Sequence, residues 1–343
     1  MTSNASHLPD EVRAPLTGGG AVVSRDSIDP LTGRIATPKP TRKSVGQRLR
    51  GMSPKLAVGL GMILAIVLFG VLGPLIVGNP RSIRDIGLTP PSGEFPLGTT
   101  QTGQDILAQL AHATQGSLLI GLIVGLGALL LSLIFGVIGS FRGGWVDESF
   151  SLFTNVMLVI PALPLIIVIS SYVPDKSIWM LAVVLTITSW AAAARGLRSV
   201  TLSLRNRDYV AAAQVSGEKS WRIITFEIIP NLVPVLAAQF VLAIIAAILA
   251  EAGLSYLGLG ASGTFTWGTM LFQAQNGFAL TLGAWWWFVP PGILIALLGG
   301  APSLVNFAID EIVDPRLRTA KLHKDQRRIK RRFNGQVEDG VVA

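Results

Sequence analysis

Two glycine-rich stretches come nearest, by residue type and spacing, to nucleotide chemistry. Gly217–Ser220 spells GEKS, the end of a phosphate-binding loop, and Gly258, Gly260 and Gly263 spell G-x-G-x-x-G. The first stretch lacks the upstream glycine and strand that let backbone amides cradle a phosphate, and Glu218 separates its glycine from the lysine. The second stretch follows a long apolar run, where a dinucleotide fold requires a strand. We therefore expect no nucleotide site on this chain.

The other residue types that carry chemistry are scattered. The chain has no cysteine, and its three histidines, His7, His112 and His323, show no metal-ligand spacing. No arrangement of serine, histidine and aspartate can be argued from their positions. The sequence thus predicts no catalytic site, no metal site and no cofactor bound by this chain, and the function has to be sought in its long apolar elements.

Composition indicates a membrane protein. Of the 343 residues, 50% are hydrophobic and 14% are charged, whereas soluble domains are about 25% charged. A helix needs about 20 apolar residues to cross a bilayer. We predict an all-α polytopic protein with six transmembrane helices, at 56–78, 118–140, 150–172, 177–194, 232–250 and 285–308.

Polar segments flank the predicted six-helix domain, 56–308. Residues 1–54 are rich in Ser, Thr, Gly, Pro and Arg and are predicted to be a disordered tail. Residues 309–343 form a basic tail. We expect no signal peptide, because the first apolar run starts only near Leu56.

The positive charges predict the topology. Of the 28 Lys and Arg residues, nine lie in 1–55, nine in 309–343 and six in the loop 195–231, and Arg142 follows the second run, while the loops on the opposite side hold three. Because cytoplasmic loops are enriched in these residues, both termini and the loop 195–231 are predicted to be cytoplasmic. Topology then explains the net charge of +8, and we expect no nucleic-acid partner.

The six runs as drawn contain no ionisable side chain, and Glu251 lies just past the fifth. Such groups in a membrane cost at least ~2.5 kcal/mol and mark proton relays and ion paths. Their absence predicts that energy for uphill transport enters from outside the membrane. An ATP-independent carrier or channel is the alternative class, and it would keep such a group at mid-membrane. A lipid anchor or sensor, using the basic run 321–332, is a third.

Two features inside the runs leave alternatives open. Pro161 and Pro164 are predicted to break or kink the third run, either for packing or along a substrate path. Gly121 and Gly125 form a G-x-x-x-G pair, which serves helix packing within one subunit or a dimer seam.

The loop 195–231 contains the stretch DYVAAAQVSGEKSW. Residues 208–216 favour a helix, and Gly217 supplies a helix stop. The alanines at 211–213 would give this helix a slim surface. It could enter a groove on a partner, or it could lie on lipid headgroups. Basic residues that suit the second alternative are Arg205, Arg207, Lys219 and Arg222.

The range Asp208–Asn231 resembles the cytoplasmic loop of bacterial ABC-importer permeases, whose pattern is E-A-A-x(3)-G-x(9)-I-x-L-P. Gly217 and Pro230 match that pattern. Ala211 stands at the glutamate position and Glu227 at the isoleucine position.

Three further stretches resemble the dipeptide/oligopeptide/nickel branch of these permeases. Phe95–Leu118 is similar to the outer-loop signature H-P-L-G-T-D-x-x-G-R-D, with Thr100 for the aspartate and Gln104 for the arginine. Ala250–Gly260 and Asp314–Arg318 are similar to E-x-x-L-S-F-L-G-L-G and D-P-R-L-R. The resemblance covers residues 56–318.

The resemblance implies a type I ABC importer permease fold in the bacterial inner membrane. It implies a transport subunit, not an enzyme, in a binding-protein-dependent importer that hydrolyses ATP. The implied partners are a second homologous permease in a heterodimer, two ATPase subunits that hold ATP and Mg²⁺, an extracytoplasmic substrate-binding protein, and membrane lipid. Short peptides are the implied substrate and oligosaccharides the alternative. The runs offer no His, Cys or carboxylate for nickel.

The resemblance also implies site residues. The helix in the loop 195–231 would couple to an ATPase subunit, with Ala212, Ala213 and Gly217 in closest contact because larger groups would prop it out of its groove. The full coupling set is Asp208, Tyr209, Ala211, Ala212, Ala213, Gly217, Glu218, Trp221 and Pro230. The outer-loop residues expected to contact the binding protein are Gly98, Thr99, Gly103 and Asp105. Pro161 and Pro164 are candidates for the substrate path.

Overall fold

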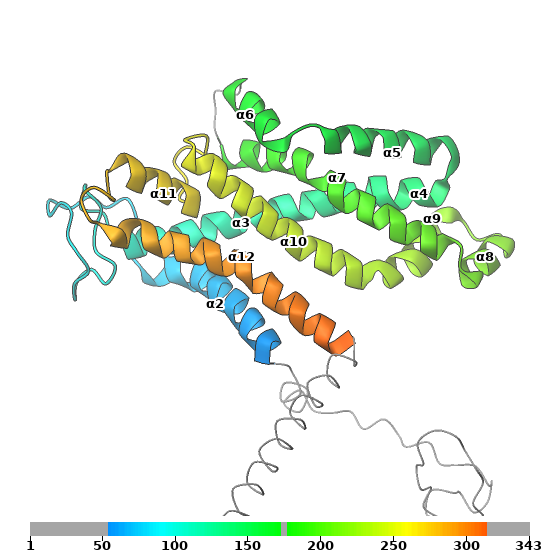
Figure 1. Ribbon diagram of the computed structural model, residues 1–343, viewed down its shortest axis with the longest axis horizontal. Helices are drawn as coiled ribbons and strands as arrows, with labels where there is room; N and C mark the ends of the chain where they lie inside the picture. The colour runs from blue at the N-terminus through cyan, green and yellow to red at the C-terminus, as the bar shows by residue number, and fades with distance from the viewer. Residues whose placement is uncertain (1–53, 173–176, 314–343) are drawn as a thin grey trace, which may run out of the picture. The chain divides into compact units, whose positions relative to one another are not determined.

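The computed structural model describes residues 54–172 and 177–313 (Figure 1). The chain divides into two units, 1–52 and 53–343, and the description concerns the second. The tail predicted at 1–54 lies outside the described residues except for Pro54, as does the basic tail from residue 314 onward.

Helices make up most of the described chain. Their bounds are α2 Pro54–Ile76, α3 Ile106–Ser132, the π-helix η2 Leu133–Ile138, α4 Gly139–Arg142, α5 Gly144–Val159, α6 Ala162–Tyr172, α7 Ile178–Arg205, α8 Asp208–Val215, α9 Ser220–Ile223, the π-helix η3 Ile224–Ile228, α10 Ile229–Tyr256, α11 Trp267–Asn276 and α12 Trp285–Val313. Within the described ranges the one β feature is an isolated bridge between Thr99 and Asp105. The prediction of an all-α fold is confirmed.

Within residues 54–172 and 177–313, five helical segments are long and apolar enough to cross a membrane, and the count is six if the bent pair α5–α6 forms one span. The five are Ala57–Ile76, Ile106–Arg142, Ile178–Arg205, Ser220–Tyr256 and Trp285–Pro302. The bent pair turns by 84°. The turn falls at Ile160 and Pro161, because proline has no N–H to continue the helix. The predicted break at Pro161 is confirmed.

The fifth span extends further than its apolar run. Helix α10 continues to Tyr256, so Glu251 lies inside the helix, with 0% of its surface exposed. Gly258 lies in the turn that closes the helix, where its φ of +79° suits glycine and its N–H donates to the Ser255 carbonyl over 3.0 Å. The expectation that the spans hold no ionisable group is therefore wrong at Glu251, because apolarity fell at this residue while the helix continued for another turn.

Helix α3 packs against α2, α7 and α10, and Figure 1 shows α2 beside α12. A side chain at Gly121 would begin 2.6 Å from Ile248 of α10, and one at Gly125 would begin 2.7 Å from Ile244. The G-x-x-x-G pair therefore serves close packing between helices of the same subunit. Helix α8 lies at one end of this bundle and the segment 79–105 at the other (Figure 1).

Candidate functional site

Helix α8 presents one exposed face and one inward face. Val210 is fully buried, and Ala213 packs on the same apolar cluster as Leu197 and Ile224. The opposite face carries exposed residues at helical spacing i, i+3, i+4 and i+7. They are Asp208, Ala211, Ala212 and Val215, and the last is 89% exposed. Small and apolar residues exposed together make this face suitable for docking into a partner.

Gly217 terminates helix α8. Its N–H donates to the Gln214 carbonyl over 3.1 Å, and the Glu218 N–H donates to the Ala213 carbonyl over 3.1 Å. This paired closure needs a left-handed residue, and Gly217 has φ +79°. A side chain there would meet nothing within 4 Å. The predicted helix and its stop are confirmed, and backbone conformation, not space, requires the glycine.

The remaining coupling residues follow α8 in the chain. Glu218 pairs with Arg222 at 3.4 Å, and Trp221 is 61% exposed. Tyr209 is exposed on α8, and Pro230 is exposed in the first turn of α10. The structure thus places the predicted set on α8, its closing turn, α9 and the start of α10.

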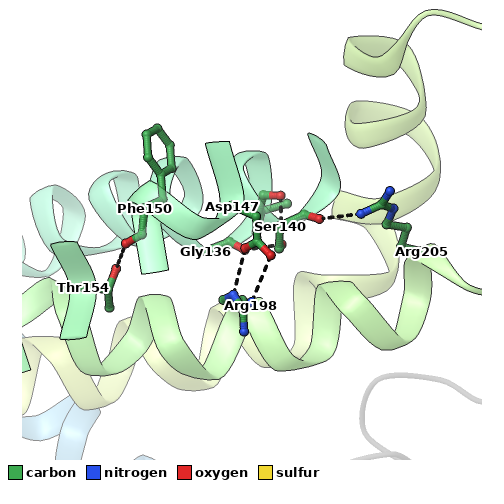
Figure 2. Close-up of polar contacts among 8 residues, drawn as sticks. Gly136, Ser140, Asp147, Phe150, Thr154, Arg198 and Arg205 are labelled. Atoms are coloured by element: carbon green, nitrogen blue, oxygen red, sulfur yellow. Dashed lines mark hydrogen bonds and ion pairs between the residues drawn. The ribbon is translucent and has the colours of Figure 1, made fainter. Parts of the chain in front are cut away.

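Arginines at the end of α7 hold neighbouring helices (Figure 2). Arg198 forms a fork with Asp147 of α5, with Nε to Oδ1 at 2.8 Å and Nη2 to Oδ2 at 2.9 Å. Arg205 donates to the Ser140 carbonyl of α4 over 3.2 Å. Paired N–H groups on a carboxylate fix orientation as well as distance. We name these contacts of Arg198 and Arg205 the α7 clamp.

The sequence did not predict the contacts of the α7 clamp. The signal was present, since Arg198 and Arg205 are seven residues apart and share a helix face. Their partners lie 51 and 65 residues away, which no local pattern gives. Only Asn206 and Arg207 separate α7 from α8. A short connection therefore runs from the exposed face of α8, through α7, to the bent pair α5–α6.

The residues of the outer-loop signature point into the interior of the loop 79–105. The Thr99 hydroxyl accepts from the Thr89 N–H and donates to the Gly87 carbonyl, both at 2.8 Å, and Thr99 is fully buried. The Asp105 side chain caps α3 by accepting from the Leu107 N–H at 2.8 Å.

The two glycines of the signature are buried as well. Gly98 has φ +71°, and a side chain there would begin 2.6 Å from the Thr89 carbonyl and 2.8 Å from Trp286. Gly103 has φ +73° and packs against the Arg84 backbone. These residues shape the loop from within, whereas the neighbouring Gln101 and Thr102 are exposed. Contact between the loop and a binding protein stays a prediction.

A buried polar cluster ties α11 to α10 and α3. Glu251 Oε1 accepts from the Ser255 hydroxyl at 2.5 Å and from the Thr266 hydroxyl at 2.8 Å. Trp267, next in the chain, donates its backbone N–H to Ser117 and its indole N–H to Thr114, both at 3.0 Å. The spacing of Glu251 and Ser255 (i, i+4) could have signalled the first bond.

The Glu251 cluster has the chemistry of a structural tie. The Oε1 oxygen of Glu251 accepts from two hydroxyls, while Oε2 is buried without a hydrogen-bond partner among the described residues. Within the described ranges no group of three His, Cys, Asp or Glu side chains gathers to hold a metal. Thr266 is also the capping residue of α11. The cluster therefore sets where α11 begins.

The chain is similar in sequence to a known family of membrane proteins. Residues 128–319 match the family described as binding-protein-dependent transport system inner membrane component. The chain is 34% identical over 275 residues to the oligopeptide transport system permease protein OppC of Bacillus subtilis (strain 168), covering 79% of this chain and 88% of the relative. It is 31% identical over 271 residues to the dipeptide transport system permease protein DppC of the same organism, covering 77% and 83%.

A mycobacterial relative and a solved structure are also similar. The chain is 32% identical over 266 residues to OppC of Mycobacterium tuberculosis (strain ATCC 25618 / H37Rv), covering 76% of this chain and 89% of the relative. An inward-facing structure of the MetNI methionine ABC transporter aligns with a TM-score of 0.46 and 14% identity, covering 58% of this chain and 96% of that chain. From the family match and the identity to these permeases, the chain belongs to the family of binding-protein-dependent transport system inner membrane components and is a multi-pass permease subunit of the cell membrane.

Proposed function

We propose that this permease carries short peptides inward and that α8 is the element through which an ATPase subunit drives it. Support for the substrate comes from relatives named for oligopeptide and dipeptide transport. The observation that carries the coupling role is the exposed face of α8 that Ala211, Ala212 and Val215 form with their short side chains. Helix α8 follows directly after α7 in the chain. Both termini and α8 lie on the cytoplasmic side in this proposal.

The proposed assembly contains this chain and a second, homologous permease. Two ATPase subunits, which hold ATP and Mg²⁺, bind α8 and its counterpart, and a binding protein delivers peptide to the outer side. When the ATPase pair closes, α8 moves with α7, because only two residues join them. The α7 clamp passes that motion to α5 and α4 through Asp147 and Ser140.

The test of docking is a bulky substitution on the exposed face of α8. In the complete transporter in proteoliposomes, Ala212→Trp is expected to lower ATP-driven peptide uptake by at least about tenfold, the effect of about 1.4 kcal/mol of lost docking energy. The matched control is Gln214→Trp, which is exposed on the same helix about 200° away. Equal uptake by Ala212→Trp and the parent protein would exclude docking through this face.

The driving force is tested in the same vesicles. Uptake is expected to require nucleotide hydrolysis and to be absent with a proton or sodium gradient alone. The buried Glu251 makes this comparison necessary, because an acidic group in a span is what an ion-coupled carrier would use. Gradient-driven uptake without ATP contradicts the proposal. Elution of an oligosaccharide from the native binding protein contradicts the substrate assignment.

A further inference from the structure

Both π-helices of the chain as described line one cavity. Its volume is about 320 Å³, with Val137 of η2 and Ile224 of η3 among its apolar walls. Arg142, the last residue of α4, and Trp221 of α9 also line it. A π-helical turn is uncommon and often marks a functional site. Here two such turns, from segments far apart in the chain, line the same cavity. This distinguishes the cavity from the other pockets on the surface.

The cavity lies on the side predicted to be cytoplasmic. Arg142 ends the helical segment Ile106–Arg142, which is one of the spans. Trp221 belongs to the loop that carries six of the basic residues. Arginine and tryptophan at the end of a span are typical of the headgroup level of a bilayer. The cavity therefore opens near the headgroups of the inner leaflet.

Arg142 differs in its partners from Arg195, Arg198 and Arg222. Arg195 binds Asn155 at 2.8 Å, Arg198 binds Asp147, and Arg222 binds Glu218 at 3.4 Å. In the part of the chain that the structure describes, the Arg142 guanidinium has no hydrogen bond or ion pair, and the residue is exposed. An unpaired guanidinium over apolar walls is complementary to an anionic group that carries a hydrocarbon chain.

We propose that this cavity binds one anionic phospholipid of the inner leaflet. The phosphate pairs with Arg142, because a guanidinium matches phosphate oxygens in geometry and charge. The acyl chain lies along Val137 and Ile224, and Trp221 lies at headgroup level. The lipid then joins the end of the second span to the segment that follows α8, and so supports the proposed coupling region. The binding itself rests on membrane insertion alone, and does not depend on the peptide substrate or on α8 docking.

The experiment uses the complete transporter in nanodiscs with phosphatidylglycerol or phosphatidylcholine that carries a photoreactive acyl chain. In the parent protein, phosphatidylglycerol is expected to label the peptides of η2 or η3 about fivefold more than phosphatidylcholine does, the preference expected for one basic residue. Arg142→Gln should abolish this preference, and Arg142→Lys should retain part of it. Arg207→Gln is the matched control, since Arg207 is exposed on the same side and does not line the cavity.

Two outcomes overturn the proposal. Equal labelling by the two lipids, or undiminished preference in Arg142→Gln, shows that no anionic site exists. The second is the absence of lipid label together with a disulfide, formed under an added oxidant, between Thr225→Cys and a cysteine introduced into a partner subunit, which makes the cavity a protein interface. Size-exclusion profiles of the variant complexes confirm assembly, and Arg142 is exposed, so its substitution leaves the packing of the bundle intact. Peptide uptake is measured separately, so failure of lipid binding is distinguishable from failure of transport.

Discussion

At the residue scale, the pair between Arg198 and Asp147 depends on the shape of arginine. The planar fork places Nε and Nη2 on the two carboxylate oxygens at 2.8 and 2.9 Å, and lysine cannot reproduce both bonds. The Asp147 side chain is largely shielded from solvent, while that of Arg198 is partly exposed. The pair is therefore worth about 1 kcal/mol or somewhat more, enough to hold one relative position of α5 and α7.

Breaking this pair is predicted to uncouple transport. Asp147→Asn should lower the peptide taken up per ATP hydrolysed by about fivefold, as for a loss of about 1 kcal/mol, with ATPase activity kept. The exchange Asp147→Arg with Arg198→Asp should recover part of the coupling relative to either single change. Arg84→Gln, which breaks an exposed pair with Glu94 on the outer loop, is the control and should change nothing. An unaltered uptake ratio in Asp147→Asn removes the clamp from the mechanism.

Substitutions at Gly217 distinguish the effect of backbone strain from the effect of side-chain size. At φ +79° any other residue costs about 1–2 kcal/mol, and the space around it is open. Gly217→Ala should therefore fray the end of α8 and reduce uptake moderately. Gly217→Trp carries the same strain plus a bulky group, and should abolish uptake while the protein still inserts. If the two variants transport equally, bulk at this turn does not matter and docking close to Gly217 is refuted.

At the element scale, α11 is held by a carboxylate of α10 and by two hydroxyl groups of α3. Its first residues, Thr266 and Trp267, are bonded to Glu251 of α10 and to Ser117 and Thr114 of α3. A helix this short is not stable by itself in water. Its position therefore depends on the Glu251 cluster, which lies at the opposite end of α10 from the coupling loop.

Removing the carboxylate is predicted to release α11. Glu251→Ala leaves two buried hydroxyls without their acceptor and opens a cavity, at a cost of about 2–4 kcal/mol. The expected result is faster hydrogen exchange over residues 266–276 and a lower apparent Tm in detergent. Glu251→Gln keeps one carbonyl acceptor, so it should retain most of the protection and ATP-driven uptake. Complete loss of uptake in Glu251→Gln with normal exchange would instead assign the carboxylate a role in proton transfer.

At the scale of the whole molecule, much of the apolar surface is exposed on helices that span the membrane. Side chains such as Leu75, Val159 and Tyr172 are at least 80% exposed. In the membrane this surface is available to lipid and to the partner subunits of the proposed assembly. Which part of it faces a partner is decided by the composition of the purified complex.

Purification from native membranes checks this composition. A mild detergent and an affinity tag on this chain are expected to recover a second permease of the same family and two ATPase subunits, measured by quantitative mass spectrometry. The Ala212→Trp variant should recover the second permease but less ATPase, because the substitution lies on the α8 face. A stable complex of this chain alone would contradict the proposed assembly.

The sequence alone determined the elements of this protein. Apolar run length predicted helices of the right class, Pro161 predicted the break that bends α5 against α6 by 84°, and Gly217 predicted the end of α8. Each of these depends on a few neighbouring residues. A helix closes its hydrogen bonds within one segment, and its ends follow from local backbone geometry.

The tertiary structure alone decided how those elements are joined. It placed Asp147 on Arg198 across 51 residues, buried Glu251 against Thr266, and turned Gly98 and Thr99 into the interior of the outer loop. These outcomes depend on which side chains meet when separate helices pack. That choice is set by contacts between distant segments, which the pattern within any one segment does not contain.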